Sequence, residues 1–234
     1  MVYYNSEGIV DNLIKAVLFD LDGTLVNTLG DLALSVNHIL ESHGHPTHKE
    51  DKYKLFAGNG NEVMMRRALP EEKRNDREYV LSLRSEFYDY YKEHCADVSY
   101  LYDGIKELLE TLKENGILIA IVTNKAQVMT DVLVPKLMDK NIFSAIIGQR
   151  DGIPTKPEPH MPFLAMSEMD VNPDECLFVG DSNADIQTGL NCGNTPVGVL
   201  WGFRDREELE SSGARYIVST PSEIFDIIKS INEC

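Results

Sequence analysis

The chain has 234 residues, of which 43% are hydrophobic and 26% are charged. These fractions are ordinary for a globular protein, so a disordered, collagen-like or coiled-coil chain is excluded. The length suffices for one large domain or for a domain with a smaller partner. The formal net charge of −16 disfavours nucleic acid and anionic membranes as partners, because both are negatively charged.

Targeting and membrane signals are missing from the sequence pattern. The first fourteen residues, MVYYNSEGIVDNLI, carry acids and polar groups instead of a basic end followed by an apolar stretch, so we expect no signal peptide. No apolar run approaches the roughly 20 residues that cross a bilayer. The four cysteines lie far apart, without the spacing of a zinc site. We therefore expect a cytoplasmic protein, as a monomer or a homodimer.

Short runs rich in Val, Ile and Leu recur along the chain and predict strands. They are Ala16–Phe19, Ile117–Val122, Ala145–Gly148, Cys176–Val179, Pro196–Leu200 and Tyr216–Val218. Stretches with apolar residues three and four positions apart separate most of them and predict helices. This alternation is typical of an α/β fold with an open, mostly parallel sheet covered on both faces. Such sheets bind ligands at the carboxyl ends of their strands.

One long interval interrupts the alternation after the first strand. Residues 28–100 contain no convincing buried strand, and helical patterns cover Leu29–Leu40, Asn61–Leu69 and Asp76–His94. The aromatic residues late in the last of these stretches, among them Tyr91, are expected to pack that helix. We therefore predict a helical cap domain at 28–100, inserted into a core domain made of 1–27 and 101–234.

Polar side chains follow the first two predicted strands. Asp20 and Asp22 come directly after the first strand, where a tight turn alone would explain them about as well as a site. Thr123 and Asn124 end the second strand, and the first N–H groups of the following helix would add an anion seat there. Asn124 is alternatively the N-cap of that helix. Neither position decides the function alone.

Two further strand ends carry charged residues. Lys156 follows the third strand between two prolines, which restrict the backbone around it. Asp181 and Asp185 follow the fourth strand, and Asp185 also suits the cap of the next helix. Carboxylate oxygens are ligands that Mg²⁺ prefers. A metal ion together with a lysine would attract a phosphate dianion despite the acidic surface. Together the four strand ends predict one phosphate site.

The segments DLDGT, TN, KPEP and GDSNAD resemble the four motifs of the haloacid dehalogenase superfamily, in its Mg²⁺-dependent phosphatase branch. The resemblance covers almost the whole chain, because order and spacing match and the helical insertion is similar to that family's α-helical cap. It implies a Rossmann-like core. It also implies that Asp20 is the nucleophile, forming an aspartyl-phosphate, and that Asp22 is the general acid and base.

The same resemblance implies the binding residues. Thr123, Asn124 and Lys156 would hold the phosphoryl oxygens of a small phosphorylated metabolite. Mg²⁺ would be bound by side chains or backbone at positions that the four motifs supply, namely Asp20, Asp22 through its carbonyl, Asp181 and, in support, Asp185.

Several smaller stretches resemble bacterial phosphoglycolate phosphatases and their pyrophosphatase relatives, including Gly58-Asn59-Gly60 and the segment Gly198 to Arg204. We therefore expect hydrolysis of 2-phosphoglycolate to glycolate and phosphate. Pyrophosphate or a sugar phosphate is the alternative substrate, and a phosphomutase of the β-phosphoglucomutase kind or a non-catalytic phosphate-binding protein is an alternative class. Gly58, Asn59 and Gly60 are the candidates for binding the substrate carboxylate, because glycine lets backbone N–H groups approach closely.

Overall fold

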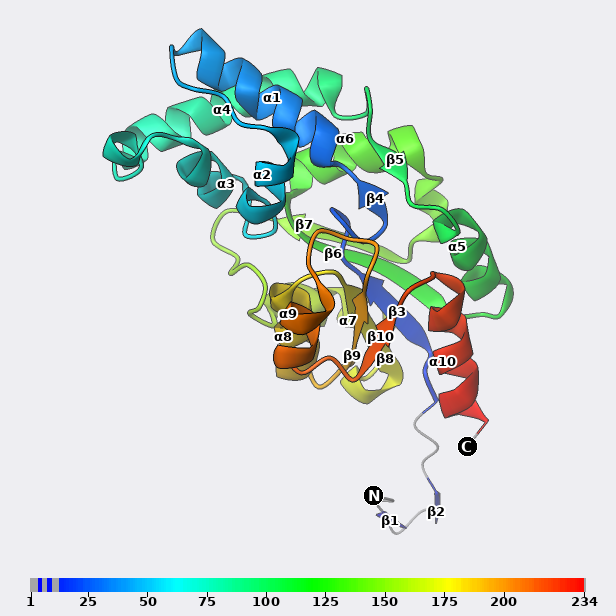
Figure 1. The fold of residues 1–234 in the computed structure, drawn as a ribbon. Helices are drawn as coiled ribbons and strands as arrows, with labels where there is room; N and C mark the ends of the chain where they lie inside the picture. Colours follow the sequence, from blue (N-terminus) through cyan, green and yellow to red (C-terminus); the bar gives the residue numbers. More distant parts are fainter. Residues whose placement is uncertain (1–3, 6–7, 10–12, 234) are drawn as a thin grey trace.

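The computed structural model describes residues 4–5, 8–9 and 13–233 (Figure 1). Strands β1 (Tyr4–Asn5) and β2 (Gly8–Ile9) form a short antiparallel pair before the main sheet. Most of the segment on which the signal-peptide expectation rests lies outside the described residues. Within the described part of the chain, no helix has both the length and the apolar character needed to cross a membrane.

A six-stranded parallel sheet forms the centre of the fold, with the strand order β10-β9-β8-β3-β6-β7. Its strands are β3 (Ala16–Phe19), β6 (Leu118–Ala126), β7 (Ala145–Gln149), β8 (Cys176–Gly180), β9 (Thr195–Val199) and β10 (Tyr216–Val218). After β3 the chain adds strands on one side, and from β8 onward on the other. The carboxyl ends of β3 and β8 therefore meet at a topological switch point, where α/β sheets bind ligands. The predicted α/β class is confirmed.

Helices cover both faces of this sheet, as Figure 1 shows. One face packs against α5 (Ile105–Glu114), α6 (Gln127–Leu137) and α10 (Ser222–Asn232), and the other against α7 (His160–Met169), α8 (Asn183–Cys192) and α9 (Arg206–Ser211). In β3, Val17 and Phe19 belong to the first hydrophobic cluster and Leu18 to the second. Alternate residues of a strand point to opposite faces, so burial on both sides accounts for its unbroken apolar run.

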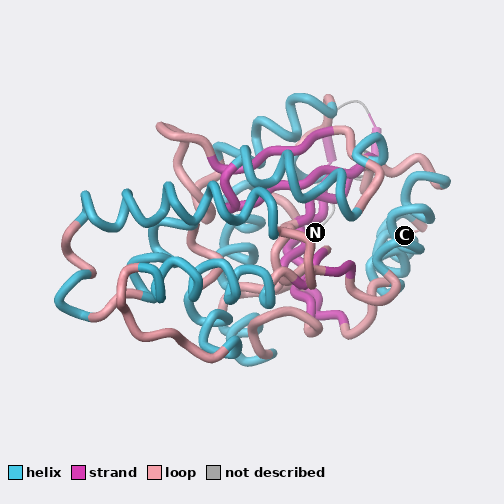
Figure 2. The backbone as a smooth tube through the Cα atoms, turned by 90° about the horizontal axis from the view of Figure 1, so that it is seen from above, coloured by secondary structure: helices cyan, strands magenta, loops and turns pink. Residues whose placement is uncertain are grey.

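Four helices gather beyond the carboxyl edge of the sheet, at the top of Figure 1. They are α1 (Leu29–Ser42), α2 (Glu50–Phe56), α3 (Asn61–Ala68) and α4 (Arg77–His94), which pack on one another. Figure 2 views the molecule from the side on which these helices lie. We call α1–α4 the cap, and residues 28–100 remain our proposal for the inserted domain. One short 3₁₀ helix, Glu71–Lys73, lies between α3 and α4, and two others lie in the core at Lys140–Ile142 and Pro173–Glu175.

The chain passes between core and cap at two adjoining points. Strands β4 (Val26–Asn27) and β5 (Tyr100–Leu101) pair antiparallel there. Beside them, the buried carboxylate of Asp31 accepts hydrogen bonds from the N–H groups of Val98 and Ser99 and from the Ser99 hydroxyl, at 2.6–3.2 Å. This carboxylate ties the start of α1 to the segment that leaves the cap.

Most predicted strands agree with the structure to within one residue, but β6 is longer than predicted. It continues through Thr123 and Asn124 to Ala126, with a shift in its register against β7 between Thr123 and Ala126. The following helix begins at Gln127, and its N-cap residue is Ala126. The interpretation of Asn124 as a helix N-cap is therefore wrong, because strand pairing persists past the point where the apolar pattern stops.

Candidate active site

Asp20 and Asp22 lie in a tight turn at the carboxyl end of β3. The N–H of Asp20 donates to the Val179 carbonyl at 2.9 Å, which continues the pairing with β8, and Asp20 is 6% exposed. Gly23 has a φ of 91°, and a Cβ atom at this position would lie 2.5 Å from Oδ2 of Asp181. The tight turn is therefore part of the site. It needs glycine at position 23, because the carboxylate of Asp181 leaves no room for a Cβ atom there.

Lys156 lies at the centre of the charged groups and is 3% exposed. Its Nζ donates to Oδ1 of Asp20 and to Oδ1 of Asp185, each at 2.6 Å, and to the Val122 carbonyl at 3.0 Å. Burial lowers the pKa of Lys156, but the two carboxylates outweigh this and raise it above its usual value. The lysine therefore remains an ammonium at neutral pH, as a site for phosphate requires.

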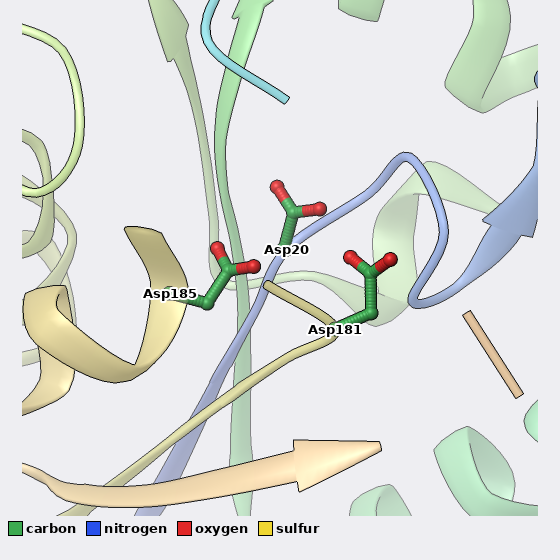
Figure 3. A group of neighbouring side chains, drawn as sticks. All are labelled: Asp20, Asp181 and Asp185. Atoms are coloured by element: carbon green, nitrogen blue, oxygen red, sulfur yellow. The ribbon is translucent and has the colours of Figure 1, made fainter. Parts of the chain in front are cut away.

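Asp181 and Asp185 extend from the end of β8 and the start of α8 toward Asp20, as Figure 3 shows. Asp185 also caps α8, because its Oδ2 accepts hydrogen bonds from the N–H and the hydroxyl of Ser182, at 3.0 and 2.6 Å. Asp181 accepts from the N–H of Phe203 at 2.6 Å. Both roles foreseen for Asp185, helix cap and member of the acidic group, apply to the same side chain.

The three carboxylates form a group suited to a divalent cation. Ligand atoms of Asp20, Asp181 and Asp185 all lie within 4.8 Å of one another, and all three residues are buried. Burial raises the pKa of Asp20 to about 7, and burial together with Asp185 and Asp20 raises that of Asp181 well above its usual range. Lys156 supplies one positive charge for this cluster. A hard dication with oxygen ligands would supply the remaining charge.

Thr123 and Asn124 line the same cavity from β6. The Asn124 side chain donates to the Gly58 carbonyl at 3.0 Å and to the Lys156 carbonyl at 3.2 Å, and accepts from the N–H of Lys156 at 2.7 Å. Its amide therefore joins the cap loop to the loop that carries Lys156. The Thr123 hydroxyl accepts from the N–H of Lys125 at 3.2 Å, which leaves its own proton available to a phosphoryl oxygen.

The glycine-containing cap loop faces this cavity from the opposite side. Gly58 and Gly60 line the cavity, with φ angles of 99° and 85°, whereas Asn59 is not among the lining residues. Asn61, the first residue of α3, lines it as well, and its Nδ2 is buried without a hydrogen-bond partner. The loop thus brings the N-terminus of a helix and a free amide donor to the cavity.

Asn61, Lys125 and Arg204 are among the cavity residues that sequence reasoning missed. The Lys125 ammonium contacts Asp22, and its place directly after Thr123 and Asn124 was the available signal. Arg204, in the loop after β9, donates to the Lys54 and Ala57 carbonyls at the end of α2. No local pattern separates that arginine from one on the surface, because its partners are backbone atoms of the cap.

Similarity to known proteins agrees with this geometry. The sequence model for the haloacid dehalogenase-like hydrolase family matches residues 17–199. The chain belongs to this family. A phosphoglycolate phosphatase from Mannheimia succiniciproducens is 34% identical over 92% of the chain and 98% of the relative. An N-acetylmuramic acid 6-phosphate phosphatase from Pseudomonas aeruginosa is 32% identical over 94% and 98%.

Solved structures of haloacid dehalogenase-like hydrolases share the fold. A predicted phosphoglycolate phosphatase from Haemophilus somnus superposes with a TM-score of 0.82 at 30% identity, over 93% of this chain and 99% of that one. The expected family and the expected enzyme class, a phosphatase, are confirmed. Phosphatases of this family need a divalent metal, and the cluster of Asp20, Asp181 and Asp185 is able to bind one.

Proposed function

We propose that this phosphatase hydrolyses 2-phosphoglycolate to glycolate and phosphate with Mg²⁺ as its cofactor. The observation that carries the reaction type is the buried contact between Asp20 and Lys156, since it places a nucleophile beside a cation for the phosphoryl oxygens. The names of the phosphoglycolate phosphatase relatives support the substrate. Asp20, Asp181, Asp185 and the carbonyl of Asp22 would hold Mg²⁺, which neutralises charge on the phosphoryl group.

The proposed reaction has two displacements on phosphorus. The Asp20 carboxylate forms a bond to phosphorus while the bond to the glycolate oxygen breaks, and Asp22 gives that oxygen a proton. Water then attacks the phosphorus of the aspartyl-phosphate while the bond from phosphorus to the Asp20 oxygen breaks, and Asp22 takes a proton from that water, so that phosphate leaves and the Asp20 carboxylate is restored. Lys156 and Thr123 hold the phosphoryl oxygens throughout. Acid–base assistance of this kind is typically worth about 10²–10⁴-fold in rate.

The cap side of the cavity supports a substrate that carries a carboxylate. The unpartnered Nδ2 of Asn61 and the N-terminus of α3 are donors suited to an anion, since a helix N-terminus favours negative charge. We propose that these groups bind the glycolate carboxylate, with Gly58 and Gly60 allowing close approach. Asn59 lies outside the lining and is the weakest of the predicted contacts.

A phosphorylated sugar acid is the second candidate substrate. The observation that favours it is the relative from Pseudomonas aeruginosa, whose name specifies N-acetylmuramic acid 6-phosphate. Both named substrates are phosphorylated acids, so the cap donors would serve either one.

The test is phosphate release with Mg²⁺ from 2-phosphoglycolate, N-acetylmuramic acid 6-phosphate, pyrophosphate and β-glucose 1-phosphate, with Asp20→Asn as control. We expect a preference for 2-phosphoglycolate of at least about a hundredfold in kcat/KM. A preference for another ester would reassign the substrate and leave the mechanism intact. Transfer of phosphate between positions of glucose without its release would indicate a phosphomutase. Full activity of Asp20→Asn would overturn the mechanism.

A further inference from the structure

Lys125 is a buried lysine that the reaction steps above do not use. It lies in β6 and is 3% exposed. Burying an ammonium group is costly unless it is paired and hydrogen-bonded. Its Nζ donates to both carboxylate oxygens of Asp22, at 3.1 and 3.2 Å. The proposed acid–base residue is thus held along both oxygens by a side chain from a neighbouring strand.

The cap supplies the remaining contact of this ammonium group. Nζ of Lys125 also donates to the hydroxyl of Tyr91 at 3.0 Å, and lies 4.6 Å from the centroid of the same ring. Tyr91 belongs to α4 and is fully buried. The sequence predicts only a packing role for this tyrosine. The ring does pack in the hydrophobic core, and its hydroxyl in addition accepts a hydrogen bond from the ammonium of Lys125.

The carboxylate of Asp22 has one further donor. The hydroxyl of Thr28, at the start of the cap, donates to its Oδ1 at 2.8 Å. Oδ1 thus accepts from Lys125 and Thr28, and Oδ2 accepts from Lys125. Together these hydrogen bonds define the plane of the carboxylate as well as its position. A general acid has to present one oxygen to the leaving group, and small misplacements cost rate.

We propose that Lys125 is a positioning residue for Asp22, and that Tyr91 positions Lys125. This inference rests on the proposed function, because it gives Lys125 a part in the proton transfer made by Asp22. Lys125 itself touches neither the substrate nor the phosphoryl group in this scheme. The competing role is purely structural, in which the hydrogen bond from Lys125 to Tyr91 fastens the cap to the core.

The two roles differ in their dependence on the leaving group. When the bond from phosphorus to the leaving oxygen breaks, a glycolate oxygen needs the proton of Asp22. A 4-nitrophenolate leaves readily as an anion and gains little from an acid. A misplaced Asp22 therefore slows the alkyl ester more than the aryl ester, whereas a loosened cap slows both alike. The ratio of the two kcat/KM values reports the first displacement, free of later steps.

The experiment compares 2-phosphoglycolate with 4-nitrophenyl phosphate in Lys125→Met and Tyr91→Phe. The control variant is Lys136→Met, because Lys136 also reaches α4 from the core, with Nζ 3.2 and 3.3 Å from the Lys92 and Glu93 carbonyls. Asp22→Asn gives the full size of the leaving-group effect.

We expect Lys125→Met to lower kcat/KM for 2-phosphoglycolate by about 10–100-fold, a part of the roughly 10²–10⁴-fold that general acids contribute. Its loss on 4-nitrophenyl phosphate should stay below about threefold, since little acid catalysis is needed there. Tyr91→Phe should shift the ratio in the same direction by about threefold, because it removes one hydrogen bond of the Lys125 ammonium and leaves the ion pair with Asp22 in place. Lys136→Met should leave the ratio unchanged.

Equal losses on both esters in Lys125→Met would overturn the inference and assign the lysine to cap attachment. An unchanged ratio in Tyr91→Phe would overturn the part played by the tyrosine. If Lys125→Met does not fold, an unchanged ratio in Tyr91→Phe would overturn the whole inference. A shifted ratio in Lys136→Met would overturn it too. If the wild-type enzyme hydrolyses neither ester, the proposed function fails. If it hydrolyses both and the ratio never moves, only this inference fails.

Discussion

The two walls of the cavity are made of different groups. The wall at the carboxyl edge of the sheet carries charged side chains in direct contact, with Lys156 between Asp20 and Asp185. The opposite wall, from the cap, offers the apolar side chain of Met64, glycine backbone and the amide of Asn61. Charge that has to meet a reacting phosphoryl group sits on a rigid sheet edge. Groups that would select the rest of the substrate sit on a short helix and its loop.

In the proposed reaction, the core wall carries the chemistry and the cap wall selects the substrate. The core residues come from several strand ends, so changing any of them disturbs a shared network. The cap contacts are few, and the Gly58 carbonyl links them to that network through its hydrogen bond from Asn124. Changes on the core wall are therefore expected to abolish turnover, and changes on the cap wall to redirect it.

The largest expected effect is that of Asp20→Asn, on the core wall. The variant lacks the proposed nucleophile but keeps nearly the same shape, so we expect kcat to fall by at least about 10³-fold with the fold retained. Phosphate release measures the loss of turnover, and far-ultraviolet circular dichroism measures whether the fold is retained. Residual activity above a tenth of wild type would show that another group attacks phosphorus.

The second prediction concerns pH and stability without metal. The pKa of Asp20 is raised by burial to about 7, so the folded state holds this proton more tightly than the unfolded chain does. Stability from this group is therefore greatest near pH 4 and falls as pH rises toward 7, by a few kcal/mol, on the order of 1.4 kcal/mol for each pKa unit. The groups named on the cap wall, which are Met64, glycine backbone and Asn61, do not titrate and add no pH dependence of stability.

Urea unfolding of wild type and Asp20→Asn in chelator, between pH 4 and 8, measures this difference. The wild type should lose stability relative to the variant across that range, and Mg²⁺ should restore it. Parallel curves for the two proteins would contradict the assignment of a proton to Asp20.

The third prediction tests the metal-binding role of the core wall without altering a charged group. A Cβ atom at Gly23 would lie 2.5 Å from Oδ2 of Asp181, so Gly23→Ala displaces this carboxylate. We expect a loss of Mg²⁺ affinity of about 10–100-fold, as for other changes beside metal ligands. Activity titrated against Mg²⁺ measures it.

Gly152→Ala is the matched control for this substitution. Gly152 also has a positive φ, 81°, but a Cβ atom there meets nothing within 4 Å. It carries the same backbone cost without the clash. An equal loss of Mg²⁺ affinity in both variants would assign the effect to backbone strain.

The smallest effect is expected on the cap wall. Asn61→Asp places a carboxylate where the proposed substrate carboxylate binds, so KM for 2-phosphoglycolate should rise by about tenfold, the equivalent of about 1.4 kcal/mol. Turnover of 4-nitrophenyl phosphate, which has no carboxylate, should change little. A similar rise in KM for both esters would place Asn61 in phosphate binding instead.

The cap was less predictable than the core. Helix α2 was not foreseen, because its seven residues, EDKYKLF, are too few to show a helical period. The strands of the sheet were predicted closely, since burial on both faces leaves long apolar runs in the sequence. The end of β6 was misplaced because backbone pairing with β7 extends past its apolar part.

The sequence by itself determined the α/β class, the family and the residues at the four strand ends, because these depend on local composition and on the order of short motifs. Tertiary structure alone decided the surroundings of Lys125, Asn61 and Arg204. Each of these residues contacts groups that are distant in the sequence. Lys125 contacts Asp22 and Tyr91, Asn61 lines the cavity, and Arg204 donates to carbonyls of the cap. A side chain's burial and its partners are properties of packing, which no local pattern contains.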